Sequence, residues 1–351
     1  MIHMVHRELW IALVMLPSPL WSQFPSVGQT VSRRHPLTEV PVTMRVPLPR
    51  SPDWLAIGYG SVWVVNYKPD RLSRVDPHTG RVTAEVPLGP TACLGVVLAR
   101  GSVWVPTCGD GVLNEIDPRT NHLVRRIPVP IAGGREGSFA YSHGSFWLPA
   151  NAPDSSSSTV VRIDAQSGAV QQRIAVGARA DVAVAGFGAV WVASSATDTL
   201  FRIDPIRNAV VARIAVGHSP KFMTVGAGAL WVQNRQDGSV SRVDPVTNRE
   251  VARIETHAPT PWGDIAAGNG AIWLSVDSTP VTRIDPRTNT VSDQYVGGSG
   301  ADAIRVGYGA VWVADHEHGE VWRIDFAPPG PRSKSSTISP GRDSSRRAWR
   351  S

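Results

Sequence analysis

Residues 181–208 read DVAVAGFGAVWVASSATDTLFRIDPIRN, and this stretch decides the fold. Its first apolar run ends in a Gly-Phe-Gly turn at residues 186–188, where glycine adopts the positive φ of a tight turn without strain. A second apolar run surrounds Trp191, a third ends at Asp204, and residues 209–216 form a fourth. Four short apolar runs separated by turn residues predict four antiparallel strands.

The same unit occurs seven times along the chain. Each copy has a glycine turn, a tryptophan three residues later, and an aspartate that begins a second turn. A period of 39–44 residues, with a turn about every ten residues, is typical of a four-stranded propeller blade. We therefore interpret the tryptophans as packing between blades rather than as a cofactor site. The repeated residues are Trp63, Trp104, Trp147, Trp191, Trp231, Trp273 and Trp312, with Asp76, Asp117, Asp164, Asp204, Asp244, Asp285 and Asp325.

The two ends of the repeat array predict how the ring closes. The last unit stops after its third run, at residues 321–325, whereas residues 42–48 resemble the fourth strand of the other units. Pairing these two segments completes the seventh blade and removes two open sheet edges. We predict an all-β fold over residues 36–326: a seven-bladed β-propeller with four-stranded blades, closed by an N-terminal strand that completes the last blade.

The chain has two cysteines, Cys93 and Cys108, on either side of a turn at Arg100-Gly101. If that turn has two residues, the cysteines lie directly opposite each other across one hairpin. Opposed strand positions come close enough for a disulfide, so we predict a Cys93–Cys108 bond; two buried free thiols are the alternative. A disulfide persists in an oxidising compartment.

The first 23 residues have the pattern of a secretory signal peptide. Basic residues precede an apolar run at residues 9–16, which is too short to span a bilayer, and prolines and small residues follow it. We predict a signal peptide at residues 1–23, a leader or linker at residues 24–35, and an exported protein, periplasmic or extracellular. A disordered leader from a misplaced start codon is the alternative.

The net charge of +6 resides at the two ends of the chain. Residues 327–351 carry +5 and the residues before Pro36 carry +2, which leaves −1 for the propeller. The tail is rich in Ser, Arg and Pro without apolar periodicity, so we expect it to be disordered and solvated rather than bound to RNA or an anionic surface. We expect no specific nucleic-acid partner, no membrane span, and a monomer.

Two kinds of loop distinguish the faces of the propeller. The glycine and aspartate turns barely vary between units, which indicates a structural role. The loops between second and third strands, with the connections between blades, differ in every unit and lie on the opposite face, which we call the variable-loop face. Variable loops on a rigid frame are where binding residues tend to lie. The candidate ligand-binding residues are Asn66, Tyr67, Lys68, Asn151, Asp198, Lys221, Asn234, Arg235, His257, Trp262, Asp277 and Asp315.

Acidic residues recur where the innermost strands begin, at the rim of the central channel. The equivalent rim positions include Asp53, Asp181, Lys221 and Asp302, and Asp264 lies one place along from another. We consider Asp181, Asp264 and Asp302 as ligands for a divalent cation, Mg²⁺ or Ca²⁺, because these ions prefer oxygen ligands. Carboxylates that accept N–H groups or stay solvated are the alternative.

The tightest cluster of acid–base residues is His316-Glu317-His318. On an extended loop, residues i and i+2 face the same way, so the two histidines would share a metal or flank a substrate. We therefore take these three residues as the catalytic candidates. An exposed loop without such a role explains them equally well.

Two motifs connect the chain with known propellers: GYGAVWV at residues 307–313 and RIDPRTN at residues 283–289. They resemble the YVTN-type, YncE-like family of exported bacterial propellers and the related streptogramin B (virginiamycin B) lyase-like family. Resemblance to the lyases implies opening of a cyclic depsipeptide by elimination at its ester linkage, with a histidine base and Mg²⁺ held by a glutamate. The Trp-Phe-Thr-Glu strand ends of those lyases are absent here, because every repeat tryptophan is followed by Val or Leu.

We therefore carry three hypotheses for function. The leading one is an exported binding scaffold that recognises a small molecule, peptide or protein on the variable-loop face. The second is a metal-assisted carbon–oxygen lyase or hydrolase, and the third is a protein-assembly platform in the cell envelope. The sequence has no Gly-x-Ser-x-Gly elbow, P-loop or His-Glu-x-x-His motif, and its glycine pairs open strands rather than helices.

Overall fold

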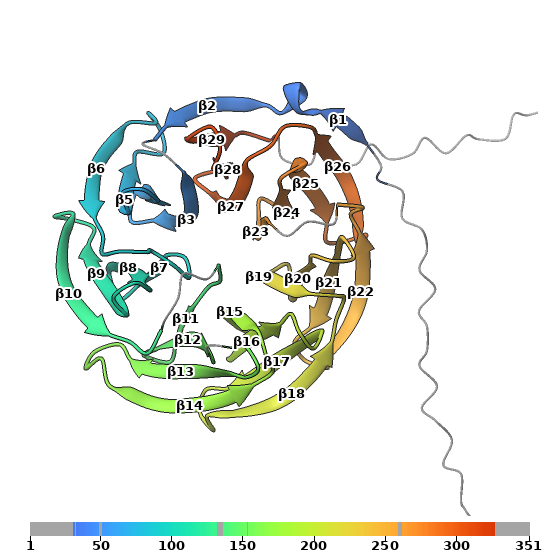
Figure 1. Ribbon diagram of the computed structural model, residues 1–351. Coiled ribbons are helices and arrows are strands. Elements are labelled where there is room, and N and C mark those ends of the chain that lie inside the picture. Colours follow the sequence, from blue (N-terminus) through green and yellow to red (C-terminus); the bar gives the residue numbers. More distant parts are fainter. Residues whose placement is uncertain are drawn as a thin grey trace, which may run out of the picture.

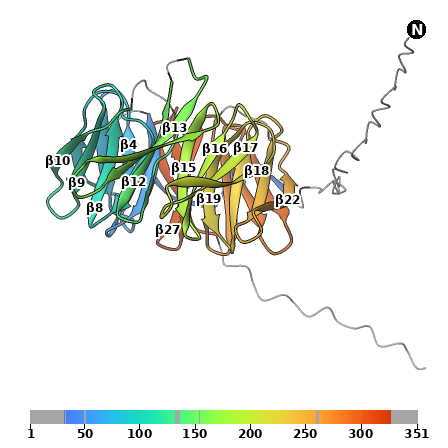
Figure 2. The same ribbon diagram turned by 90° about the horizontal axis from the view of Figure 1, so that it is seen from below.

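The computed structural model describes residues 31, 33–48, 51–131, 136–152, 154–258 and 262–326. The signal peptide, most of the leader and the basic tail predicted above lie outside these residues. Within them the chain forms seven sheets around a central axis, as predicted (Figure 1). Seen from the side, the sheets form a flat disc (Figure 2). No helix of the described part is long and apolar enough to cross a membrane.

The first six blades follow one another in chain order, and each begins with its innermost strand. Blade 1 contains β3 (Pro52–Gly58), β4 (Ser61–Asn66), β5 (Arg71–Val75) and β6 (Val82–Pro87). Blade 2 contains β7 (Val97–Ala99), β8 (Ser102–Thr107), β9 (Val112–Asp117) and β10 (His122–Pro128). Blade 3 contains β11 (Ala140–Ser142), β12 (Ser145–Asn151), β13 (Ser158–Asp164) and β14 (Val170–Val176). Blade 4 contains β15 (Ala180–Gly186), β16 (Ala189–Ser194), β17 (Thr199–Asp204) and β18 (Ala209–Ala215). Blade 5 contains β19 (Pro220–Gly226), β20 (Ala229–Asn234), β21 (Ser239–Asp244) and β22 (Arg249–Glu255). Blade 6 contains β23 (Asp264–Gly268), β24 (Ala271–Val276), β25 (Thr279–Asp285) and β26 (Thr290–Val296).

The seventh blade is shared between the two ends of the propeller. It contains β27 (Ala301–Gly307), β28 (Ala310–Asp315) and β29 (Glu320–Ile324), and β2 (Val42–Pro47) is its outermost strand (Figure 1). β2 pairs antiparallel with β29, with Val46 opposite Val321. The predicted closure by an N-terminal strand is therefore confirmed.

A fifth strand on blade 6 was not anticipated from the sequence. β1 (Arg34–Pro36) pairs in parallel with β26, and the 3-10 helix η1 (Leu37–Glu39) connects it to β2. Its flanking Arg33 Nη2 lies 2.8 Å from Asp293 Oδ1, and His35 Nε2 lies 3.4 Å from the same oxygen. The end of the expected linker thus covers one outer sheet edge.

Each repeat tryptophan is buried between blades and is fixed at its indole nitrogen. In blade 4, Trp191 is fully buried and its Nε1 donates to the carbonyl oxygen of Gly186, at 3.0 Å. The other six tryptophans donate to the residue five places before them in the same way, at 3.0–3.2 Å. The glycine turn and the tryptophan are therefore one structural unit.

An arginine joins this tryptophan to the next blade. Arg202 lies directly across the strand pair from Trp191, with its guanidinium 5.2 Å from the ring centroid. Its Nη1 donates to Pro245 O at 2.9 Å and to Asn248 Oδ1 at 2.8 Å, in the aspartate turn of blade 5. We call this contact the Trp–Arg–turn contact. It recurs through Arg74, Arg162 and Arg242, and Arg323 of blade 7 donates to Pro77 O of blade 1 at 2.6 Å.

The aspartate turn is shaped to receive that arginine. Asp204 Oδ1 accepts the backbone N–H groups of Ile206 and Arg207, at 2.8 and 3.0 Å. These two hydrogen bonds stabilise the carboxylate and hold the pKa of Asp204 below its usual value. Asn208 takes a left-handed φ of 54°, and its side chain accepts from Arg162 of the preceding blade. The Arg-x-Asp-Pro-x-x-Asn motif therefore encodes contacts within and between blades.

Blade 2 makes the same contact with different residues. Glu115 stands opposite Trp104, where the other blades have arginine. Arg125 of the outer strand lies 5.5 Å from the Trp104 ring centroid and pairs with Glu115 at 3.0 Å. It then donates to Ala165 O of blade 3 at 2.8 Å, so a cation still joins the tryptophan to the following turn.

The predicted disulfide between Cys93 and Cys108 is present, with a Cα–Cα distance of 5.9 Å. The predicted direct opposition of the two residues is wrong. Val97 lies opposite Trp104, but nearer the cysteines the pairing has shifted by two residues, so that Ala92 pairs with Thr107. Leu94 and Gly95 both adopt positive φ, at 53° and 81°, and these two extra residues make the cysteines diagonal neighbours.

We predict that Arg202→Met lowers the free energy of unfolding by about 2–4 kcal/mol, because it removes two charge-assisted hydrogen bonds and a cation–π contact. Urea unfolding followed by tryptophan fluorescence measures this loss. Arg207→Met is the matched control, because Arg207 is exposed and its Nε lies 3.7 Å from Asp204 Oδ2, within the same turn. Equal stability of the two variants would contradict a stabilising role for the Trp–Arg–turn contact.

We predict that replacing Cys93 and Cys108 by serine costs about 3 kcal/mol, as expected for a cross-link that closes a loop of 15 residues. Thiol titration of the unfolded, unreduced wild-type protein should find no free thiol. Two titratable thiols per chain would show that the bond does not form.

Candidate functional site

The channel opens on the variable-loop face into a cavity of about 490 Å³. Its walls come from loops and strand starts of blades 1, 2, 3, 6 and 7. Five carboxylate side chains line it: Asp53, Glu136, Asp277, Asp302 and Glu317. Three aromatic side chains line it as well: Tyr67, Trp262 and His316. The cavity is therefore acidic with aromatic walls.

Asp53, Asp302 and His316 meet at one side of this cavity. Each offers a ligand atom, and the three atoms lie within 4.8 Å of one another. Asp53 belongs to β3 and Asp302 to β27, the innermost strands of neighbouring blades, so the first residues of both strands reach the same rim. His316 follows β28 on a loop above them. The ring closure between blades 7 and 1 thus assembles the group.

Burial and neighbouring carboxylates raise the pKa of both carboxyls. Burial, followed by the charges of Asp302 and Glu136, raises the pKa of Asp53 well above its usual value. Burial and the charge of Asp264 raise the pKa of Asp302 to about 6. Carboxylates so crowded are stabilised by any cation that enters the cavity.

Tyr67 forms a hydrogen bond with Asp53 and helps to hold its carboxylate in place. Trp54 Nε1 donates to the Tyr67 hydroxyl at 2.9 Å, and that hydroxyl forms a hydrogen bond with Asp53. Burial and the charge of Asp53 raise the pKa of Tyr67, so the phenol stays protonated and donates to the carboxylate. The Tyr67 ring also meets His316 edge-on, with centroids 6.3 Å apart.

A buried lysine holds the opposite side of the rim. Lys221 Nζ donates to Glu136 O at 2.7 Å and pairs with Asp181 Oδ2 at 3.2 Å. Burial lowers the pKa of Lys221 and raises that of Glu136 to about 7. Arg235 Nη1 lies 3.8 Å from Glu136 Oε2. Glu136 carried no repeat signal in the sequence, and nothing there indicated that it would reach the rim.

The structure does not bring the three metal candidates together. Asp181 is engaged by Lys221 and by the side-chain amide of Asn151, and Asp264 forms an ion pair with Arg305. Asp302 instead meets Asp53 and His316. The repeat alignment placed these carboxylates on the rim, but it did not show which of them face a cation.

The three catalytic candidates also separate. Residues 316–319 form a tight turn rather than an extended loop, with the Gly319 N–H bonded to Asp315 O at 3.0 Å. Asp315 is buried and accepts the backbone N–H and the Nδ1 of His318, at 3.0 and 2.8 Å. This hydrogen bond raises the pKa of the exposed His318. His316 and Glu317 line the cavity, whereas His318 contacts Asp315 outside it.

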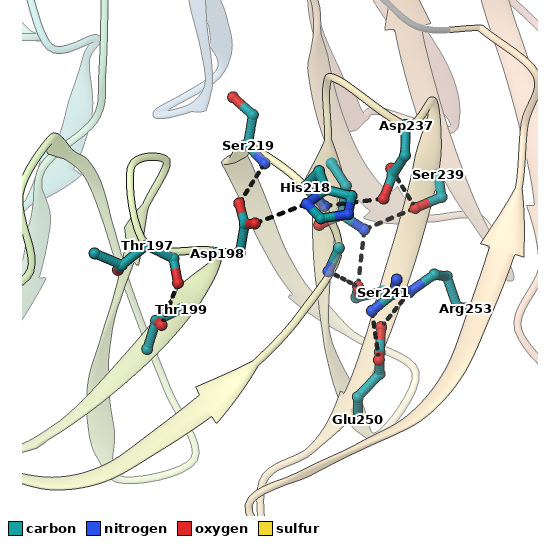
Figure 3. Close-up of polar contacts among 12 residues, drawn as sticks. Thr197, Asp198, Thr199, His218, Ser219, Asp237, Ser239, Ser241, Glu250 and Arg253 are labelled. Atoms are coloured by element: carbon teal, nitrogen blue, oxygen red, sulfur yellow. Dashed lines mark hydrogen bonds and ion pairs between the residues drawn. The ribbon is translucent and has the colours of Figure 1, made fainter. Parts of the chain in front are cut away.

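Several ligand candidates instead hold the variable loops in place. Asn66 and Asn234 are buried and donate to neighbouring serines, such as Asn66 Nδ2 to Ser73 Oγ at 2.8 Å. Asp198 bridges blades 4 and 5: it accepts the Ser219 N–H at 2.8 Å and pairs with His218 at 2.7 Å (Figure 3).

Asp277 joins blades 6 and 7 in the same manner, by accepting the N–H of Gly300 at 2.7 Å. It also lines the cavity, so it combines a structural contact with a place at the site. Lys68 and His257 are exposed on the variable-loop face, and Lys68 borders a second hollow beside His316 and Glu317.

The comparisons with known proteins bear on the repeat and not on an activity. Residues 196–319 match a repeat of unknown function (DUF6923). The match covers about a third of the chain, from blade 4 to the turn of blade 7, and includes Asp302 and His316 but not Asp53. No curated protein matches the chain. The chain is thus a β-propeller scaffold with such a repeat within it.

We predict that Lys221→Met lowers the free energy of unfolding by about 3–5 kcal/mol, because it leaves the Asp181 side chain, which is only 12% exposed, without its cation. Adding Asp181→Asn to the same chain should recover most of the loss. Urea unfolding of the two variants measures both effects. A Lys221→Met variant as stable as wild type would contradict a stabilising ion pair between Lys221 and Asp181.

Proposed function

We propose that this chain is an exported binding protein that holds a small, positively charged molecule in the cavity of the variable-loop face. The observation that carries the proposal is the convergence of five carboxylates and three aromatic rings on about 490 Å³. That volume is in the range of small-molecule sites, about 300–1,000 Å³. A peptide or protein would reach it only with a protruding cationic side chain.

The charge of the walls favours a cationic group over a neutral or anionic one. Burial keeps the pKa of Asp302 near 6 and that of Glu136 near 7, and an incoming cation stabilises the ionised form of both. Trp262 is 55% exposed, and Tyr67 lines the same cavity. Aromatic faces of this kind attract alkylammonium groups.

Two further observations support export. The Cys93–Cys108 disulfide is consistent with an oxidising compartment. The signal-peptide pattern of residues 1–23 and the resemblance to YVTN-type exported propellers point to the periplasm or the cell exterior. The frame itself is rigid, because each blade is joined to the next through buried contacts, so the loops meet a ligand with little reorganisation.

A lyase-like activity is the second candidate, and one observation favours it. His316 stands in the cavity beside two carboxylates, where a base and a cation would both be available to a substrate. The exposed His318, bonded to Asp315, has no part in this arrangement.

We predict that choline raises the melting temperature of the protein, whereas its neutral isostere 3,3-dimethylbutan-1-ol does not. Trp262→Ala should weaken choline binding about tenfold, as expected for the loss of a cation–π contact worth about 1–2 kcal/mol. Isothermal titration calorimetry measures the affinity.

Phe187→Ala is the matched control, because Phe187 is an aromatic residue, 41% exposed, on the opposite face. It should bind choline like wild type. An equal response to choline and its neutral isostere, or an equal loss in the two variants, would overturn the proposal.

A further inference from the structure

We propose that Asp53, Asp302 and His316 form a divalent-cation site on the wall of the cavity. The proposal rests on the proposed function in one respect, that the ion shares the cavity with the ligand. The three ligand atoms lie within 4.8 Å of one another, a separation that one ion with bond lengths of about 2.0–2.4 Å bridges after small adjustments of the side chains. They come from three segments: β3, β27 and the turn after β28.

The charge balance of the rim singles out this group. In the described part of the chain, the salt bridges pair Asp181 with Lys221 and Asp264 with Arg305. Neither Asp53 nor Asp302 has such a partner among those residues. Asp53 is only 8% exposed, so its carboxylate is shielded from water as well. Two crowded carboxylates without a cation are the arrangement that a metal ion neutralises.

His316 supplies a second, independent observation. Its Nδ1 is buried and has no hydrogen-bond partner among the described residues. Buried polar atoms of proteins are nearly always paired, so a partner is missing at this nitrogen, on a ring that offers one of its two nitrogens to the group. A coordinated ion would hold the ring against the carboxylates and account for this placement of the side chain.

The surroundings fix two of the three ligands, Asp53 and His316, in place. Tyr67 forms a hydrogen bond with Asp53 and accepts one from Trp54, so the carboxylate is held by a phenol that is itself fixed. The backbone N–H of His316 donates to the carbonyl oxygen of Gly300 at 2.7 Å. Gly300 has φ 87°, and a Cβ there would lie 2.6 Å from Asp315 Oδ1, so glycine is needed for this close approach. Such supporting contacts are typical of metal sites.

The ligand set selects among ions. One imidazole nitrogen with two carboxylates suits Mn²⁺ or Zn²⁺ better than Mg²⁺ or Ca²⁺, which prefer oxygen ligands throughout. Three protein ligands leave at least one coordination position open, and that position faces the cavity. The ion can therefore bind a donor atom of the molecule that occupies the cavity.

The test is titration of the whole metal-free protein with Mn²⁺ and Zn²⁺, without any organic ligand. We expect one ion per chain, and at least tenfold weaker binding in Asp302→Asn and in His316→Gln. His318→Gln is the matched control, because it changes the same turn outside the group, and it should bind within twofold of wild type. Circular dichroism checks that each variant is folded.

Saturating binding that is unchanged in Asp302→Asn and His316→Gln would overturn the site, and so would no binding by the folded wild-type protein. Choline titration in excess EDTA separates this outcome from the proposed function. If choline binds while no metal does, the ion site is wrong and the binding cavity stands. If one ion binds through these residues while choline does not, the ion site is supported and the organic ligand must be another.

Discussion

Six of the seven blades are joined to the next by one kind of contact, in which an arginine lies over a buried tryptophan and donates to the turn of the following blade, as Arg202 does in blade 4. In blade 6, Arg283 lies over Trp273 but faces Asp293 of its own blade. Because the burial of apolar surface is non-directional, this polar contact fixes how neighbouring blades are placed. Because Arg323 of blade 7 reaches Pro77 of blade 1, the same interaction also closes the circle. That closure brings β3 beside β27, and with them Asp53 beside Asp302. The site is therefore a consequence of the ring.

Most of the fold could be predicted because it is repeated. Seven tryptophans at one spacing define the blades, and the unpaired run at residues 42–48 defines the closure. Features that occur once were not predictable. β1 contains only Arg34–Pro36 and has no strand pattern of its own. The register shift beside Cys93 depends on the left-handed backbone of Leu94, a residue type that gives no signal for it.

The location of the candidate site could be predicted from the sequence, but the contacts among its residues could not. The repeat alignment put Asp53, Asp181 and Asp302 on one rim, and the cavity lies there. The alignment gave no information on which rim residues pair between neighbouring blades, which depends on single residues such as Lys221 and Arg305. Asn66 and Asn234, two of the ligand candidates, are instead the buried last residues of β4 and β20 and support the loops that follow. Variation between repeats therefore marks the face that carries the cavity, but not the residues that line the cavity.

Anomalous diffraction from crystals soaked in Mn²⁺ tests the site most directly. One peak between the Asp53 and Asp302 carboxylates and the His316 ring is the predicted result, with its open side towards the cavity. A peak at Asp181 or Asp264 instead, or no ordered ion on this face, would contradict the assignment of the channel mouth as a cation-binding site.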